Sequence, residues 1–457
     1  MASSMPNYFP LRPLLSRNVV LLACLALSSS AAHGQMLARP GWTAATSSAS
    51  SQWSKHSIVY ETAPNAFADS TGAGSLKGIT QRLDYLQSLG VDAILLTRIQ
   101  PATGDATRLA QVDPGYGTAD DLDDLVHQAS RVNLRVLMDL EQRPTTADTL
   151  AVARFWLNHG IAGFRLIPAA QSGPLAGAAL SASNETLHAQ VAELRKLVAS
   201  FMGQRIVIAP ADPAGSDAPA PRITKSNSRP GHTEVTLAYL PILPTPPPLT
   251  AASIRTGVEA SQAALQHGTP LLATDAQDAP RSMARYGNGT NDLDIAKVVA
   301  TALLSTPGTS LLYYGQELGL IAQTDAGAVP EFAAKQIATA EANPASLLSW
   351  YRHLGTFHHS NAAVTTGTLI PLNHDDQGIA AWVHQPQHVS LITPPVVVIC
   401  NLTDKPVQLT LKADMAKLHL RGSFLKTVLR TDSASGPMHL DGMTIPPYGV
   451  YIGELKY

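Results

Sequence analysis

The feature that most limits how this chain can fold is a set of eight short apolar runs. Each run is followed by a longer segment. A short run that is apolar along its whole length is typical of a strand buried on both faces. Such strands belong to sheets that are covered on both sides, as in parallel α/β folds. The eight runs are Ser57–Tyr60, Val91–Thr97, Leu134–Leu140, Gly163–Ile167, Arg205–Ala209, Glu234–Leu240, Pro270–Thr274 and Thr309–Tyr314.

Amphipathic segments occupy the stretches between these runs, and their apolar residues recur at the helical period. Eight strand–helix units within about 300 residues favour a closed (β/α)8 TIM barrel over an open doubly wound sheet. No glycine-rich phosphate-binding sequence follows the first run, which argues further against a dinucleotide-binding sheet. The predicted helices are Leu76–Leu89, Ala119–Arg131, Thr149–His159, Glu185–Phe201, Ala251–Gln266, Asp292–Ser305 and Phe332–Phe357.

The pattern changes at about residue 359, where helical periods give way to short β-branched runs separated by turn residues. This pattern predicts a small antiparallel β domain. We therefore expect a barrel over residues 57–358 and a C-terminal β-sandwich domain over residues 359–457. The predicted strands of the second domain are Ile379–Val383, Pro395–Cys400, Val407–Leu411, Phe424–Leu429 and Val450–Ile452.

Residues 1–34 have the pattern of an export signal, with Arg12 and Arg17 ahead of an apolar stretch and small residues after it. Residues 35–56 are rich in Ala, Ser and Thr, and we interpret them as a linker. The sequence thus predicts an extracytoplasmic protein, periplasmic or secreted, with no transmembrane segment in the mature chain. Lipid attachment at Cys24 is the alternative interpretation of the same signal.

Composition excludes several kinds of partner. The chain has 32 Lys and Arg against 34 Asp and Glu, so its net charge of −2 offers no electrostatic footprint for nucleic acid. Its two cysteines are too few for a disulfide framework or a thiolate metal site.

Several motifs, in the expected order from about residue 57 to the end, resemble the α-amylase family, family 13 of the glycoside hydrolases. The resemblance implies a barrel, a C-terminal β domain and action on α-glycosidic bonds. The motifs are Ile58-Val59-Tyr60-Glu61 with Phe67-Ala68-Asp69, Leu89-Gly90-Val91-Asp92, Val112-Asp113-Pro114-Gly115-Tyr116-Gly117-Thr118, Gly163-Phe164-Arg165-Leu166, Thr306-Pro307-Gly308-Thr309 and Tyr313-Tyr314-Gly315-Gln316-Glu317.

The resemblance also implies where the catalytic groups of the family belong, and this sequence departs from it there. Retaining hydrolysis needs a carboxylate nucleophile and a carboxylic acid on opposite sides of the scissile bond. The nucleophile belongs two residues after the arginine of the Gly-Phe-Arg motif, at Ile167, and the acid falls at Pro210. Of the three family carboxylates, only Asp275 remains.

Other departures concern the walls of the expected site. The family inserts a subdomain after the third strand, and here too few residues follow Asp139 to hold one. The loop after the first run contains a single carboxylate, Asp69, where a hard cation needs several oxygens. We therefore predict no metal and no cofactor.

The candidate site consists of Asp275 as the remaining catalytic carboxylate, with Asp139, Arg165, Tyr60 and Arg281 as substrate-binding residues. Each has a structural alternative. Arg165 is expected to pair with Asp139 or Asp275, since an arginine at a barrel mouth needs a partner. Asp275 is alternatively a polar strand end, and Tyr60 alternatively belongs to the core.

These features predict an exported α-amylase-family protein that has lost hydrolysis and acts as a carbohydrate binder or as a scaffold. Its partner would be an α-glucan, an oligosaccharide or another protein. The rival hypothesis is a weak or altered retaining α-glycosidase that uses Asp275, Asp212 or Glu141 in new positions. Separately, His358 and His359 lack further ligands at metal spacing, and we expect them at the solvated end of a helix.

Overall fold

The structure is a computed structural model that describes residues 53–97, 99–101, 110–167, 185–209, 236–243, 248–265, 268–276, 280–321 and 330–457. The predicted export signal, Cys24, Pro210 and Asp212 lie outside these ranges.

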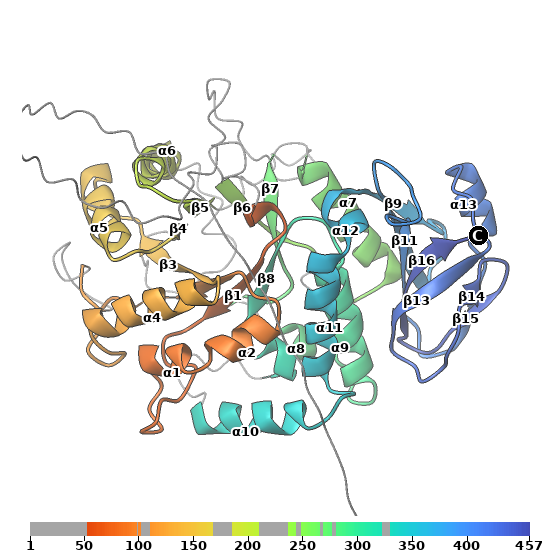
Figure 1. The fold of residues 1–457 in the computed structure, drawn as a ribbon, viewed down its shortest axis with the longest axis horizontal. Coiled ribbons are helices and arrows are strands. Elements are labelled where there is room, and N and C mark those ends of the chain that lie inside the picture. Colours follow the sequence, from red (N-terminus) through yellow and green to blue (C-terminus); the bar gives the residue numbers. More distant parts are fainter. Residues whose placement is uncertain are drawn as a thin grey trace, which may run out of the picture. The chain divides into compact units, whose positions relative to one another are not determined.

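Eight parallel strands close into a barrel in the order of the sequence, with β1 paired to both β2 and β8 (Figure 1). This confirms the predicted (β/α)8 fold. The strands are β1 Ile58–Thr62, β2 Ala93–Leu96, β3 Arg135–Glu141, β4 Gly163–Ile167, β5 Ile206–Ala209, β6 Thr236–Pro241, β7 Thr269–Ala273 and β8 Thr309–Tyr313.

Helices follow the strands, and several begin with a threonine or serine cap. Thr118 accepts a hydrogen bond from the backbone of Asp121, whose carboxylate in turn accepts one from the backbone of Thr118. Such a capping box satisfies donors that the first helical turn leaves free. The helices of the barrel are α1 Leu76–Thr80, α2 Leu83–Ser88, α4 Ala119–Arg131, α5 Thr146–Asn158, α6 Glu185–Ala199, α7 Ala251–Ala264, α8 Ser282–Tyr286, α9 Asp292–Leu304, α10 Pro330–Glu341 and α11 Leu347–Ser360.

The connection after the third strand is short. Strand β3 ends at Glu141 and helix α5 begins at Thr146, so residues 142–145 alone separate them. This connection cannot contain the subdomain that the family inserts here, as the sequence predicted.

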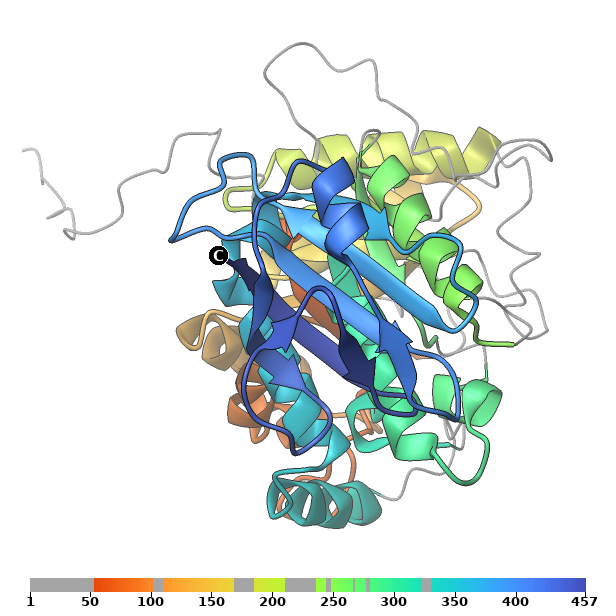
Figure 2. The same cartoon turned by 90° about the vertical axis from the view of Figure 1, so that its right-hand side faces the viewer.

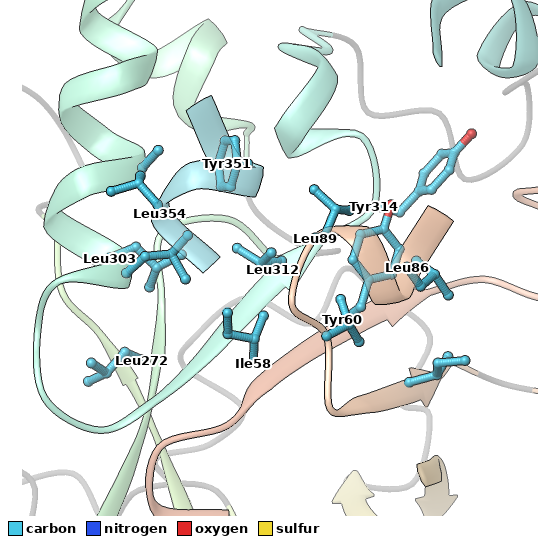
Figure 3. Close-up of a cluster of buried hydrophobic side chains, with 14 of the residues drawn as sticks. Ile58, Tyr60, Leu86, Leu89, Leu272, Leu303, Leu312, Tyr314, Tyr351 and Leu354 are labelled. Carbon is cyan, nitrogen blue, oxygen red and sulfur yellow. The ribbon is translucent and has the colours of Figure 1, made fainter. Parts of the chain in front are cut away.

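Alternate residues of each strand point into the barrel or out toward the helices. Val59, Leu95, Leu137 and Leu311 pack together in a core inside the barrel. The outward residues join a larger core with the helices, and Figure 3 shows part of it around Tyr60 and Tyr314. Whether a residue near the end of a strand points inward or outward follows from this alternation, because successive side chains of a strand point to opposite faces.

The C-terminal domain is an antiparallel sheet of six strands in the order β14-β13-β16-β11-β10-β9, with a separate β12-β15 pair (Figure 2). It confirms the predicted antiparallel domain. The elements are α12 Ala362–Thr366, β9 Thr368–Leu372, β10 Ile379–Gln385, β11 Val396–Asn401, β12 Val407–Leu409, α13 Lys412–Lys417, β13 Phe424–Arg430, β14 Met438–His439, β15 Met443–Ile445 and β16 Val450–Lys456.

The two faces of this sheet pack in different hydrophobic cores. Trp382 and Val398 on one face pack in the core shared with the barrel helices. Val383 and Ile399, one residue further along, belong to a second core with Met415 of α13. Both faces are therefore apolar, which explains why these runs look like fully buried strands in the sequence.

The junction of barrel and sheet corrects the expectation for His358. This side chain is 1% exposed, and its two ring nitrogens lie 2.8 Å from the carbonyl oxygen of Leu304 and 3.0 Å from that of His56. The expectation was wrong because contacts from elsewhere in the chain cover this end of α11. His359, the next residue, is exposed as expected.

Gly257 allows helix α7 to pack closely against the segment that follows β6. A Cβ atom at this position would lie 1.8 Å from the carbonyl oxygen of Ile242. The backbone would have to move to relieve this contact. We expect Gly257→Ala to lower the free energy of unfolding by about 1–3 kcal/mol, the usual cost of overpacking. Chemical denaturation measures this. Gly442→Ala is the control, because nothing lies within 4 Å of its added Cβ, and an equal loss in both variants would contradict the steric argument.

Within the described residues, no helix is both long enough and apolar enough to cross a membrane.

Candidate functional site

At the carboxyl end of the barrel, polar side chains occupy the inward-facing positions of several strands. Glu61 follows Val59 on β1, Asp139 follows Leu137 on β3, and Arg165 lies beside Asp139 in the register of β3 and β4. In barrel enzymes this end carries the site, because the loops after the strands meet there.

Arg165 joins two carboxylates at this end. Its Nε lies 2.6 Å from Asp139 Oδ1, and its Nη2 lies 2.9 Å from Asp139 Oδ2 and 2.7 Å from Glu61 Oε1. Both carboxylates are buried, at 3% and 1% exposure, and the guanidinium is 17% exposed. Two parallel N–H···O bonds to one carboxylate are the arrangement that a planar guanidinium favours.

Electrostatics hold this triad of Glu61, Asp139 and Arg165 in its charged form. Burial acts to lower the pKa of Arg165, but the carboxylates of Asp139 and Glu61 outweigh it and raise the pKa well above its ordinary value. The predicted pairing of Arg165 with Asp139 is therefore present. Glu61, the second partner, was not predicted in this role, although its alternation with Val59 places it on the inward face.

Ile167 ends β4 on the same inward row as Arg165 and lies beside Glu141 in the register. Its carbonyl oxygen accepts a hydrogen bond from the backbone of Gln142 at 2.8 Å, so the main chain here is fixed. An aliphatic side chain thus occupies the last inward position of this strand. Glu141 is partly exposed at the corresponding end of β3.

Asp275 lies two residues beyond the end of β7 and is 2% exposed. Its Oδ1 accepts a hydrogen bond from the backbone of Ser282, and its Oδ2 accepts one from the Ser282 hydroxyl at 3.0 Å. Arg285 Nη2 lies 3.5 Å away. Burial raises the pKa of Asp275, while the bonds from Ser282 and the charge of Arg285 oppose this. Both carboxylate oxygens are thus engaged by α8, which begins at Ser282.

Arg281 and Tyr60 are enclosed. Arg281 donates to the carbonyl oxygen of Tyr314 at 2.7 Å, and its guanidinium lies 4.6 Å from the centre of the Tyr313 ring. Tyr60 points outward from β1, is 0% exposed, and donates to Glu317 Oε1 at 2.8 Å. This placement favours packing roles for both.

Glu317 forms a second buried polar group with two tyrosines. Its Oε1 accepts hydrogen bonds from Tyr60 and, at 2.7 Å, from Tyr85. Burial raises the pKa of Glu317, and the two hydroxyl donors oppose the shift. The group connects β1, α2 and the turn after β8, and it is separate from the triad. Among the described residues, no group of three or more His, Cys, Asp and Glu side chains is arranged to hold a metal ion.

The fold and these residues can be compared with known proteins. The sequence model described as "Alpha amylase, catalytic domain" matches residues 61–143, which include Glu61 and Asp139. The trehalose-6-phosphate hydrolase of Escherichia coli is 41% identical over 95 residues, 19% of this chain and 17% of that protein. Over this segment the chain is similar to the α-amylase family.

Other α-amylase-family proteins extend the comparison. The oligo-1,6-glucosidase of Bacillus cereus is 36% identical over 96 residues, 20% of this chain and 17% of that protein. The matched segments therefore cover less than a fifth of these relatives. The structure of trehalose-6-phosphate hydrolase from Bacillus licheniformis aligns with a TM-score of 0.68 at 18% identity and covers 89% of this chain and 100% of that one. At that identity the alignment shows a shared fold.

Proposed function

We propose that this protein binds an α-glucan or an oligosaccharide at the carboxyl end of its barrel without hydrolysing it. The observation that carries the proposal is Ile167 at the last inward position of β4, two residues after Arg165. The resemblance to the family places the nucleophile there, and an aliphatic side chain cannot attack an anomeric carbon.

The other carboxylates near this end support the same proposal. Retaining glycosidases need two carboxyl groups roughly 5–5.5 Å apart across the scissile bond. Asp139 and Glu61 are already paired with Arg165, and Asp275 is bound through both oxygens by Ser282. An ion-paired carboxylate is a poor nucleophile and has no proton to give.

One finding favours the rival function, a weak or altered α-glycosidase. Several of the matching relatives carry the names of hydrolases, among them trehalose-6-phosphate hydrolase and oligo-1,6-glucosidase. Among the described residues of the barrel strands, Glu141 is a carboxylate that is partly exposed and lies on an inward-facing position. In the rival function it would act on the substrate, and in the binding function it would accept hydrogen bonds from sugar hydroxyls.

Hydrolysis and binding assays on the same protein separate the two functions. We expect no turnover of aryl α-glycosides, trehalose or maltooligosaccharides by the wild-type chain or by Asp275→Asn, because the nucleophile position is aliphatic. Turnover that Asp275→Asn abolishes would establish the glycosidase instead.

Calorimetric titration with the same sugars tests binding directly. We expect Glu141→Gln to weaken binding about tenfold, since a hydrogen bond to a charged group contributes roughly 1.5–3 kcal/mol. Asp441→Asn, an exposed position in the C-terminal domain, is the control and should leave the affinity unchanged. Absence of binding to every sugar would overturn the binder and favour a scaffold that contacts another protein.

We also propose that the chain is exported and loses residues 1–34, as the signal pattern predicts. Mass spectrometry of the extracytoplasmic fraction should find a chain that begins at Gln35. A chain that begins at an acylated Cys24 would establish the lipoprotein alternative, and an intact chain in the cytoplasm would contradict export.

A further inference from the structure

Tyr239 is a partly exposed aromatic residue on the inward face of β6. It follows Leu237 by two positions on this strand, so both side chains point into the barrel. Leu237 is buried in the core inside the barrel, and Tyr239 packs against that core from the carboxyl end. The core therefore supports one part of the ring, and the rest is accessible where the loops after the strands meet.

Pairing with β7 fixes the main chain around this residue. Tyr239 lies beside Leu271, and the pairing continues to Pro241, the last residue of β6. The backbone of Ile242 then donates to the carbonyl oxygen of Ala273 at 3.0 Å. A side chain that stands on a rigid, paired strand loses little freedom when a ligand binds, which favours affinity.

The inward positions near this end of the barrel differ in polarity from strand to strand. The triad and Glu141, at the end of β3, bring carboxylates to one side. Ile167 ends β4, and Tyr239 lies on β6, so apolar side chains follow around the barrel. Glu141, Ile167 and Tyr239 are all partly exposed. A ligand at this end would therefore meet carboxylate oxygens on one side and apolar surface on the other.

A pyranose ring has the same division of polarity. Hydroxyl groups project from its edge, whereas C–H groups cover its faces. Carboxylates accept hydrogen bonds from hydroxyls, and an aromatic ring offers a flat apolar surface to a face. We propose that Tyr239 stacks on the C–H face of a sugar ring bound at the carboxyl end of the barrel. This inference rests on the proposed binding function and names the residue that orients the sugar.

Tyr239 and Glu141 are close enough to contact one oligosaccharide. Strands β3 and β6 are separated by three steps around the barrel, which is about 14 Å along the wall. Both side chains point inward, so the gap across the mouth is shorter than the path along the wall. A disaccharide or a trisaccharide can therefore place one ring on Tyr239 while a hydroxyl of another ring donates to Glu141.

Transfer of magnetisation from tyrosine rings to a bound sugar tests the stacking directly. The protein is deuterated except at the ring protons of its tyrosines, and maltotriose or trehalose is added. We expect saturation of these ring protons to reach the C–H protons of the sugar. Tyr239→Phe, made with deuterated phenylalanine, should abolish the transfer but keep the affinity within about threefold, because an apolar ring remains. Tyr457→Phe, at a position 73% exposed in the C-terminal domain, is the matched control and should keep the transfer.

The affinity for maltotriose gives the second measurement. We expect Tyr239→Leu to weaken binding at least about tenfold, since leucine still covers the core but has no flat ring. Magnetisation transfer that persists in Tyr239→Phe, or equal affinities of Tyr239→Leu and the wild type, would overturn the inference and leave the binding function standing. If the wild type binds neither sugar, the proposed function itself fails, and the stacking fails with it.

Discussion

Lowering the pH from 6.5 to 4 is expected to cost this protein about 3 kcal/mol of unfolding free energy for each of two histidines, His358 and His384. Burial lowers the pKa of each to about 4, from an ordinary 6.5. The unfolded chain therefore takes up protons before the folded chain does. The stabilising contribution is complete above pH 6.5 and is lost as the pH falls toward 4.

The physical cause is the packing of the C-terminal sheet against the barrel helices. His384 lies on the face of β10 that carries Trp382, and both are buried with α11 and the end of α9. Two imidazolium ions would have to form in this apolar junction. The charge of His358 further lowers the pKa of His384, and the charges of His359 and His56 further lower the pKa of His358. Asp275 and Glu317 oppose this acid effect, because burial raises the pKa of their carboxyl groups.

Comparing the wild type with a histidine variant cancels the contribution of Asp275 and Glu317, because both proteins contain these carboxyl groups. His384→Leu is expected to retain about 3 kcal/mol more stability than the wild type on acidification to pH 4, since leucine takes up no proton. Urea unfolding at a series of pH values gives the slope. His353→Leu, at an exposed position on α11, is the control and should keep the wild-type slope. An unchanged slope in His384→Leu would show that this ring is hydrated and titrates normally.

Much of the barrel was predictable because its strands are apolar along their whole length. The run Gly163–Ile167 coincides with β4, and the remaining predicted strands overlap β1, β2, β3, β5, β6, β7 and β8. Where the prediction was less accurate, a local reason exists. The segment predicted as one helix over Phe332–Phe357 is divided between α10 and α11, because Pro344 interrupts it and Ser346 caps a new helix.

Contacts between distant parts of the chain were harder to predict. The strands β9, β14 and β15 are short or lie at sheet edges, where the apolar pattern is weak. The burial of His358 depends on His56 and on the C-terminal sheet, far away in the sequence. Similarly, Ser282 binds Asp275 from the start of a five-residue helix that no period could reveal. The pairing of Arg165 with Asp139 was predictable because neighbouring strand ends meet at one edge.

Arg165→Met is expected to lower the free energy of unfolding by about 3–5 kcal/mol, the usual effect of removing one partner from a buried ion pair. The variant leaves the carboxylates of Asp139 and Glu61 facing each other in a site where they are 3% and 1% exposed. Chemical denaturation at pH 7 measures the loss. Lys196→Met removes a lysine whose pairing with Glu193 is exposed, and it should change stability by less than about 1 kcal/mol.

A neutral version of the triad separates lost packing from unpaired charge. Glu61→Gln and Asp139→Asn, added to Arg165→Met, should restore most of the stability, because no buried charge then remains without a partner. If Arg165→Met alone were harmless, the guanidinium would not be committed to these carboxylates in solution and would be available to a ligand. The proposed binder would then have a cationic group in its site. A large loss with recovery in the triple variant means instead that Arg165 has become part of the framework, so a sugar must be held by other groups, Glu141 among them.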